Sequence, residues 1–465
     1  MSLEVGEVAR ILTVLAIFLS AAHLGAALFV KLRQPPVIGE IAGGLLLGPS
    51  VLALVAPSVS GWLAPTGTPT GHMLGVVYQL GTILMVFLAG LEMRPGDEGA
   101  ARRTVAYTSV LGLVIPFAGG LAIAQVIDPG ALAGPHGSAA TISLVLGLAI
   151  AVTSIPVISR IMMDLGIMDT LFARTVLTVA VIEDILLYVV LAVILGLANV
   201  QADSTHGLPA LIGAEGIGWY VAYYVAASVL FFAVFLAAGR ALFRWLSHHL
   251  LGVLERRSPV ALRLLFLFAL CLCCMGLGID PIFGALLAGI AMAEARTESM
   301  DVPTGVAAGP SAASPGLGPL RGFSLAFFVP IYFALVGFRL DVVHNLDLVF
   351  FAWLFVVACL VKFGGVWAGA RLAGNSPAWS TDFAVAMNAR GGPGIVLASV
   401  TFAAGVINAT FFVAMVLLSI FTSQLAGVWL RRTQARDNTF TSPEPGVPQV
   451  SEGVVQGEAV PETVR

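Results

Sequence analysis

Three ionisable side chains lie in apolar stretches of the sequence, where a charge is costly. Glu183 and Asp184 are neighbours in the apolar run 171–198, and Lys362 lies in a second apolar run, 346–373. Each charge would cost roughly 2.5 to 3.5 kcal/mol at the centre of a bilayer, so such residues normally line an ion pathway instead of facing lipid. Their positions predict a charged site for ion movement at mid-membrane depth.

Two other segments combine polar groups with residues that interrupt helices. Thr153 and Ser154 come just before Pro156, which has no backbone hydrogen to donate, and Arg390 is followed by Gly-Gly-Pro-Gly. Broken helices in corresponding positions of two halves are the best sequence indication of a transporter site. The alternative is that Pro156 only kinks a helix, which membranes tolerate. Arg390 then either satisfies exposed carbonyls at half-helix ends or takes part in gating.

These groups suit a site that takes a small cation and a proton in turn. Neighbouring helical residues point about 100° apart, so one acid can meet Lys362 while the other faces the broken helix. Burial disfavours the charged form of Asp184, so proton and cation compete for it. Alkali cations prefer oxygen ligands, which Asp184, Thr153, Ser154 and freed carbonyls supply, so Asp184 is the predicted ligand of a monovalent cation. A static ion pair that only orients helices is the alternative for Glu183 and Lys362.

The elements that position these residues are predicted to be membrane-spanning helices. Of 465 residues, 58% are hydrophobic and 11% are charged, and the mean hydropathy is +0.97, far above the range of soluble chains. We therefore predict an all-α integral membrane protein with about thirteen transmembrane helices. The apolar windows are 8–31, 37–56, 74–95, 104–127, 140–163, 171–200, 217–246, 260–278, 280–295, 321–340, 346–373, 380–405 and 409–431.

Arginine and lysine residues fall at every second connection between these windows, with Arg339 as the clear exception. By the positive-inside rule, the N-terminus lies outside and the C-terminus in the cytoplasm. Residues 1–431 are predicted to form one transmembrane domain, whereas the connection 297–320 and the tail 432–465 are predicted to be disordered. Helices two to six and nine to thirteen are expected to form two inverted five-helix repeats, with discontinuous helices crossing at the midplane.

Short motifs along the chain resemble those of a known family. In order, they are Gln34-Pro35-Pro36-Val37-Ile38-Gly39-Glu40, Gly48-Pro49-Ser50, Phe87 to Glu92, Thr153-Ser154, Glu183-Asp184, Gly284 to Gly289, Phe327 to Phe333, Lys362-Phe363-Gly364-Gly365 and Arg390-Gly391. The resemblance covers residues 8 to 431. In this order, the motifs are similar to those of bacterial monovalent cation:proton antiporters of the Kef and Nap type.

The resemblance implies a homodimer in the bacterial inner membrane, with a dimerisation domain and a mobile core domain. It would exchange Na⁺ or K⁺ for protons by alternating access. In that family the second acid of the pair binds cation and proton in turn, here Asp184, and the first acid can pair with a lysine, here Glu183 with Lys362. The family commonly has Asp at the first position, so Glu183 leaves open whether the exchange is electrogenic.

Other functions remain as alternatives at this stage. A gated monovalent cation channel would use the same residues as a leak, and an organic-anion/sodium symporter would use a similar inverted-repeat fold. A channel needs a continuous hydrated pore, whereas the charges lie at one depth, and an anion fits poorly beside two acids. No phosphate-binding glycine motif opens a helix, so the chain is predicted to use an ion gradient or passive flow. No enzymatic activity, cofactor or nucleic-acid partner is predicted, and the choice among Na⁺, K⁺ and Li⁺ is left open.

Overall fold

The chain folds into helices, as predicted. The computed structural model describes residues 4–32, 34–65, 67–92, 101–167, 170–201, 217–250, 252–293 and 317–436. Within these ranges the only β pairing is an isolated bridge between Ala133 and Ile407. The helices are α1 (Val5–Lys31), α2 (Pro36–Leu47), α3 (Leu52–Val55), α4 (Pro57–Leu63), α5 (Pro69–Glu92), α6 (Arg102–Ile123), η1 (Pro129–Ala131), α7 (Ala139–Ala151), α8 (Ile155–Asp164), α9 (Leu171–Gln201), α11 (Ile217–Trp245), η2 (Leu246–Leu250), α12 (Gly252–Arg257), α13 (Pro259–Gly276), α14 (Pro281–Met292), α15 (Leu317–Phe323), η3 (Ser324–Phe328), α16 (Val329–Arg339), α17 (Val342–Asn345), α18 (Leu348–Leu372), α19 (Pro377–Ala386), α20 (Gly391–Ala403) and α21 (Ala409–Arg436).

Ten helical segments in the described ranges are long and apolar enough to cross a membrane. The prediction of a multi-pass membrane protein is thereby confirmed. Each of these segments falls on one of the predicted apolar windows. The three remaining windows hold shorter helices: 140–163 contains α7 and α8, 280–295 contains α14, and 380–405 contains α19 and α20.

The boundary between α13 and α14 shows how local sequence divides one long apolar stretch into two helices. Gly278 has a φ of 73°, a left-handed conformation that glycine adopts without steric cost and that ends a helix. Asp280 then caps α14, because its carboxylate accepts a hydrogen bond from the Ile282 amide at 3.0 Å. Pro281 occupies the first helical position, where no backbone hydrogen is needed.

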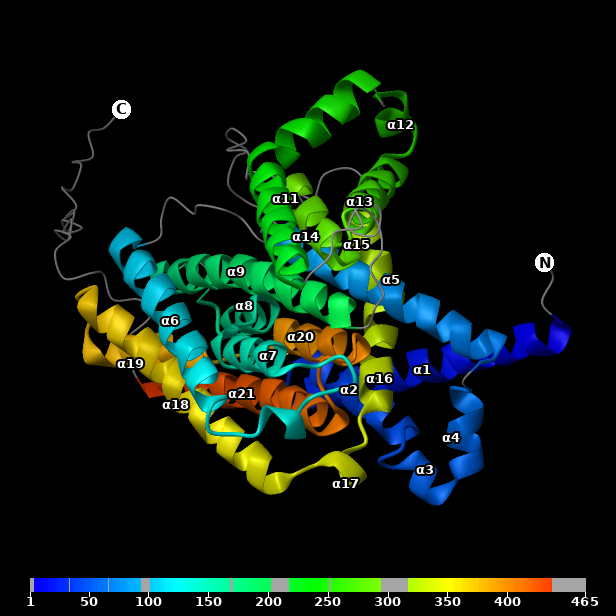
Figure 1. Ribbon diagram of the computed structural model, residues 1–465, viewed down its shortest axis with the longest axis horizontal. Coiled ribbons are helices and arrows are strands. Elements are labelled where there is room, and N and C mark those ends of the chain that lie inside the picture. Colours follow the sequence, from blue (N-terminus) through cyan, green and yellow to red (C-terminus); the bar gives the residue numbers. More distant parts are fainter. Residues whose placement is uncertain are drawn as a thin grey trace, which may run out of the picture.

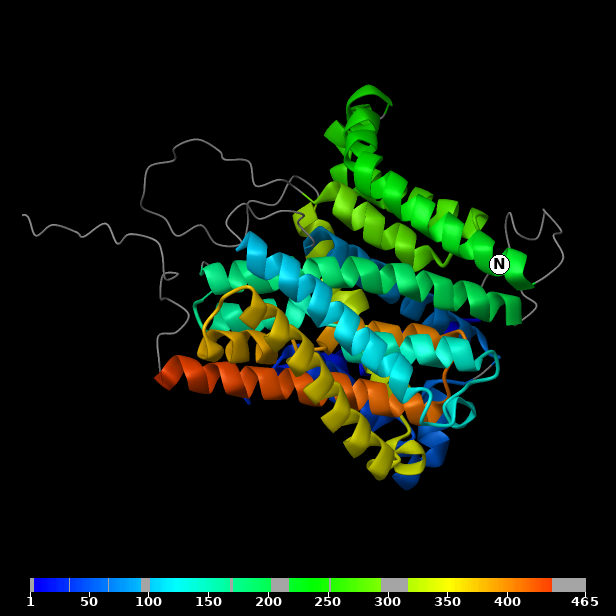
Figure 2. The ribbon, with the colours of Figure 1, turned by 60° about the vertical axis from the view of Figure 1, so that its left-hand side comes forward.

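The helices pack in two groups (Figures 1 and 2). In the first helix group, α1 packs on α2 and α16, α5 packs on α14 and α16, and α13 packs on α14. In the second helix group, α6 packs on α7 and α18, while α19 and α20 pack on α21 and α8 packs on α9. α11 contacts both groups, through α14 and α9.

Small residues bring the helices of the first group close together. A Cβ atom on Gly44 of α2 would lie 1.8 Å from the Ala334 carbonyl oxygen of α16, and one on Gly39 would lie 2.2 Å from the Gly25 carbonyl oxygen of α1. Helices in membranes commonly use such small residues to approach one another. The glycine-rich motif near the N-terminus therefore holds the first helix group together.

The predicted domain boundary at residue 431 falls inside a helix. α21 continues to Arg436, so residues 432–436 of the predicted tail are helical, and residues 437–465 lie outside the described ranges. Most of the predicted connection 297–320 also lies outside them, and its last residues begin α15 at Leu317.

Candidate functional site

Two interrupted helices meet within the second helix group. The first interruption separates α7 from α8, with residues 152–154 non-helical between them. The Ser154 hydroxyl lies at the start of α8 and accepts a hydrogen bond from the Val157 amide at 3.4 Å. Pro156 follows at the second position of α8, where its missing backbone hydrogen costs nothing. The sequence Thr-Ser-Ile-Pro therefore ends one helix and starts the next, as the predicted break requires.

The second interruption separates α19 from α20 and lies against the first. Gly391 starts α20 with a φ of 34°, in the region that favours glycine. A Cβ atom on Gly391 would lie 2.3 Å from Val157 Cγ2 and 2.6 Å from Ser154 Oγ, so the two breaks approach too closely for any other residue. The Ser154 amide donates a hydrogen bond to the Ala389 carbonyl at 2.6 Å, which ties the two connections together.

A buried ion pair lies beside this crossing. Lys362 Nζ of α18 is 2.8 Å from both carboxylate oxygens of Glu183, which is on α9. Glu183 is 1% exposed and Lys362 is 0% exposed. The Thr153 hydroxyl is 2.7 Å from Glu183 Oε2 and 2.7 Å from the Met387 carbonyl, so its single hydrogen is shared between two acceptors. The crossing is thus connected to α9 and α18 through one carboxylate.

Two cationic side chains compensate the carbonyl end of α7. Lys362 donates to the Ala151 carbonyl at 2.6 Å, and Arg390 donates to the carbonyls of Ala149 and Ile150 at 2.9 Å each. These carbonyls belong to the last turn of α7, where the helix dipole is negative and where no further amides continue the helix. This arrangement explains why an arginine and a lysine are tolerated at this depth.

Asp184 differs from Glu183 in having an oxygen without a partner. It is 1% exposed, and in the described part of the chain its Oδ1 atom makes no hydrogen bond. A buried carboxylate oxygen without a donor is costly, and it retains its full capacity to bind a proton or a cation. The structure therefore brings Glu183, Lys362 and Thr153 together and places Asp184 next to them with one free oxygen.

Two residues of the site were not singled out from the sequence. Asn388 accepts a hydrogen bond from Arg390 at 3.1 Å and donates one to the Cys359 carbonyl at 3.3 Å. Its place two residues before Arg390 was an available signal. Gly112 accepts a hydrogen bond from Lys362 through its carbonyl at 3.0 Å, and a Cβ atom there would lie 3.3 Å from Glu183 Oε1. With 51 glycines in the chain, nothing in the sequence marks this one.

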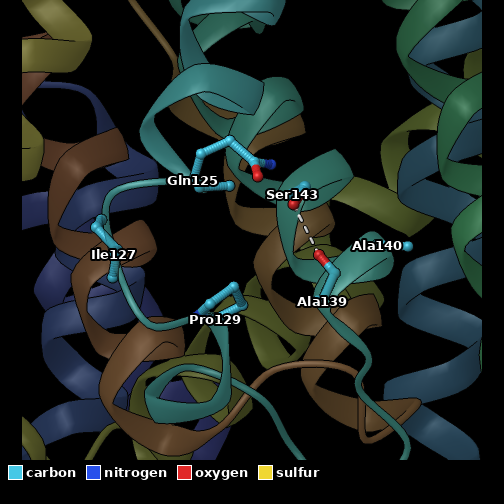
Figure 3. Close-up of a pocket in the computed structure, with 7 residues that line it drawn as sticks. Gln125, Ile127, Pro129, Ala139, Ala140 and Ser143 are labelled. Atoms are coloured by element: carbon cyan, nitrogen blue, oxygen red, sulfur yellow. Dashed lines mark hydrogen bonds between the residues drawn. The ribbon is translucent and has the colours of Figure 1, made fainter.

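A cavity of about 300 Å³ lies away from these residues, at the N-terminal end of α7 (Figure 3). Gln125, Ile127, Pro129 and Ser143 line it, and Ser143 donates a hydrogen bond to the Ala139 carbonyl at 2.7 Å. No charged side chain is among its lining residues. Because Thr153 follows the opposite end of α7, this cavity is not part of the site.

We expect Arg390→Met to destabilise the fold strongly. It would leave the carbonyls of Ala149, Ile150 and Ala358 without the guanidinium that now bonds them at 2.9 Å each. Each buried polar group that loses its partner costs about 1–3 kcal/mol. Thermal melting of the purified protein in detergent measures the effect. Arg432→Met is the control, since Arg432 is exposed, and an equal loss of melting temperature in both variants would contradict the structural role of Arg390.

Comparisons with known proteins extend over nearly the whole chain. The family model described as "Sodium/hydrogen exchanger, transmembrane" matches residues 17–435. The Na⁺/H⁺ antiporter NhaS4 of Synechocystis sp. is 26% identical over 420 residues, which cover 89% of this chain and 94% of that protein. The Na⁺/H⁺-K⁺ antiporter GerN of Bacillus cereus is 28% identical over 427 residues, covering 90% and 95%. The solved structure of the sodium proton antiporter MjNhaP1 from Methanocaldococcus jannaschii superimposes with a TM-score of 0.55 at 16% identity, covering 92% of this chain and 97% of that one, and shares the fold.

Proposed function

Because the chain belongs to the sodium/hydrogen exchanger family, we propose that it is a secondary antiporter that exchanges a monovalent cation for protons across the membrane. Membership confirms the resemblance seen in the sequence motifs, and the family is one of transporters, not of enzymes. Two relatives are named Na⁺/H⁺ and Na⁺/H⁺-K⁺ antiporters, which supports exchange of Na⁺ or K⁺ for protons in this chain.

The observation that carries the proposal is the free oxygen of Asp184 beside a neutralised pair. Glu183 and Lys362 satisfy each other at 2.8 Å, so their charges cancel locally. Asp184 Oδ1 makes no hydrogen bond among the described residues. Asp184 is therefore the group on which proton and cation compete, because binding either one neutralises the same buried charge. In this scheme Asp184 binds the cation and the proton alternately, and no cofactor takes part.

The other predicted residues have supporting roles in this scheme. Thr153 orients Glu183, and Ser154 caps α8 and joins the two connections. Arg390 compensates the end of α7, which fixes the crossing geometry next to the acids. We assign Glu183, Lys362 and Arg390 to positioning and coupling. The freed carbonyls and the hydroxyls of Thr153 and Ser154 are proposed to complete the cation's oxygen ligands.

The proposed architecture has thirteen crossings, counting α14 and the two interrupted helices together with the ten long segments. Helices two to six and nine to thirteen form two inverted five-helix repeats, supported by the two crossing interruptions. The protein lies in a bacterial inner membrane. Its N-terminus is outside and its C-terminus is in the cytoplasm, as the distribution of arginine indicates. The protein acts as a homodimer, in which the first helix group is the static part and the second helix group moves.

The alternatives fit the site less well. A channel needs a continuous hydrated pore, whereas Glu183 and Asp184 are each 1% exposed. An organic anion would meet an unneutralised carboxylate at Asp184. Proton flux in everted membrane vesicles, with Na⁺, K⁺ and Li⁺ added in turn, tests the proposal. We expect dequenching of a pH dye on addition of Na⁺ or K⁺, and the absence of any cation-dependent proton flux would contradict antiport.

Alternating access predicts that Ser154 can be reached from each side, but from one side at a time. Ser154→Cys in a background without the four native cysteines is to be treated with an impermeant thiol reagent from either face while the pH is varied. We expect labelling from one face to rise as labelling from the other falls, because the second helix group moves around the site. Simultaneous labelling from both faces at every pH would indicate a channel instead.

A further inference from the structure

A layer of hydroxyl groups lies where the two helix groups meet. Tyr78 of α5 and Tyr332 of α16 belong to the first group, and Ser399 of α20 belongs to the second. Ser399 lies next to the phenol groups of both tyrosines. Tyr332 is 0% exposed and Ser399 is 2% exposed, and the hydroxyl groups of both lack a hydrogen-bonded partner of good geometry in the described ranges. Buried hydroxyls are normally bonded, so this pair requires an explanation.

The layer extends inward from the exposed end of α16. Tyr188 lies one helical turn after Asp184 on α9 and is 1% exposed. The Tyr332 ring is 5.2 Å from the Tyr78 ring, and the guanidinium carbon of Arg339 lies 4.3 Å from the centroid of the Tyr78 ring. Arg339 is exposed at the end of α16. Arg339, Tyr78 and Tyr332 thus form a row of neighbouring side chains that leads from an exposed position into the protein, toward Ser399.

The boundary between the two helix groups is apolar nearer the point where the two interrupted helices cross. Met85 follows Tyr78 by two turns on α5, and its methyl group lies 3.1 Å from the position that a Cβ atom on Gly392 would occupy. The hydroxyl groups therefore lie on the Arg339 side of the site. In the proposed orientation this is the outer side, because α5 and α16 have their Tyr78 and Arg339 halves toward the outer face.

We propose that Tyr332 and Ser399 form the outer half of the ion pathway, where they take a partly hydrated monovalent cation on its way between Asp184 and the outer face. One residue comes from each helix group, so the pair closes the route when the groups are together and lines it with oxygen ligands when they move apart. Neutral hydroxyls bind a cation more weakly than a carboxylate, and the charge of Arg339 weakens the binding further. A cation can therefore enter this part of the pathway and leave it again, because its binding there is weak. The inference rests on the proposed antiport.

Transport measured separately from each face tests the pair. Tyr332→Phe and Ser399→Ala remove one hydroxyl each and keep the shape of the side chain. In right-side-out vesicles the cation is presented to the outer face, and in everted vesicles to the cytoplasmic face. We expect the apparent KM for the transported cation to rise by about two- to tenfold at the outer face, as for the loss of one polar contact, and to stay at the wild-type value at the cytoplasmic face.

Two matched controls separate this role from a structural one. Tyr223→Phe removes a tyrosine hydroxyl that donates to the Leu277 carbonyl at 2.9 Å. Ser228→Ala removes a buried serine hydroxyl that has no hydrogen-bond partner within the described residues, and both positions are on α11. Neither is expected to change the KM at either face. An equal rise at both faces in Tyr332→Phe and Ser399→Ala, or no rise at all, would overturn the inference. A wild-type protein that exchanges no cation would instead contradict the proposed antiport.

If Tyr332→Phe fails to fold, a labelling experiment tests whether Ser399 belongs to the outer half of the ion pathway. Ser399→Cys, in a background without the native cysteines, is expected to react with an impermeant thiol reagent added to the outer face only. Labelling from the cytoplasmic face, or from neither face, would overturn the assignment of this pair to the outer pathway.

Discussion

Asp184→Asn is expected to abolish the exchange of cations for protons. An amide has nearly the shape of a carboxyl group, but it neither takes up a proton at neutral pH nor carries the charge that attracts a cation. The remaining acid at this depth is Glu183, which is held by Lys362 at 2.8 Å and by Thr153 at 2.7 Å. Cation-dependent dequenching of a pH dye in proteoliposomes measures the exchange.

The matched control for this experiment is Asp280→Asn. Asp280 caps α14 through the Ile282 amide at 3.0 Å, and Asn caps a helix as well as Asp does. This variant is expected to retain the wild-type rate. A loss of transport in Asp184→Asn is then specific to Asp184 and not a general result of replacing an Asp by Asn. Activity of Asp184→Asn above roughly one tenth of the wild-type rate, a barrier change of only about 1.4 kcal/mol, would contradict the role of Asp184.

Lys362→Ala is expected to destabilise the protein by roughly 3–5 kcal/mol, because it leaves the buried carboxylate of Glu183 without its counter-charge. The carbonyls of Gly112 and Ala151 lose their donor in the same variant. Thermal melting in detergent measures the loss. Lys31→Ala is the natural control, since Lys31 is the other lysine of the chain and is exposed at the end of α1.

The double variant Glu183→Gln with Lys362→Gln is expected to recover much of that stability. Both charges are then absent, and the two amides can bond each other and the surrounding carbonyls. Groups in direct contact should show a large coupling free energy in such a double-mutant cycle. Strictly additive losses in Glu183→Gln, Lys362→Gln and the double variant would contradict the 2.8 Å contact between Glu183 and Lys362.

The sequence best predicted those elements whose form depends only on residues within the same segment. The long apolar stretches predicted the long helices, because each helix that spans a bilayer needs its own apolar stretch of sufficient length. The interruptions were visible for the same reason, since Pro156 and the glycines after Arg390 act on their own backbone. The last turn of α21, which ends at Arg436, was not predicted, because charged and polar residues can extend a helix beyond its apolar part without any apolar signal.

The arrangement of the site around the two acids was less predictable. Helical geometry required that Glu183 and Asp184 point apart, but it did not say which acid the Thr153 hydroxyl would contact. In the structure that hydroxyl lies 2.7 Å from Glu183. The approach of Tyr332 to Ser399 joins helices distant in the chain, for which a single sequence holds no pattern. The transport roles of all these residues remain predictions.

The carbonyl end of α7 has a consequence for how the protein is made. Its donors lie far downstream: Lys362 follows Ala151 by 211 residues, and Arg390 follows Ala149 by 241. At ribosomal rates of about 5–20 residues per second, roughly 10 to 40 s pass between synthesis of α7 and arrival of the lysine. Until then the nascent α7 carries unsatisfied carbonyls, which the hydrocarbon core does not tolerate. We therefore expect the final placement of α7 in the bilayer to follow synthesis of the C-terminal half, so that membrane insertion of this chain is completed late.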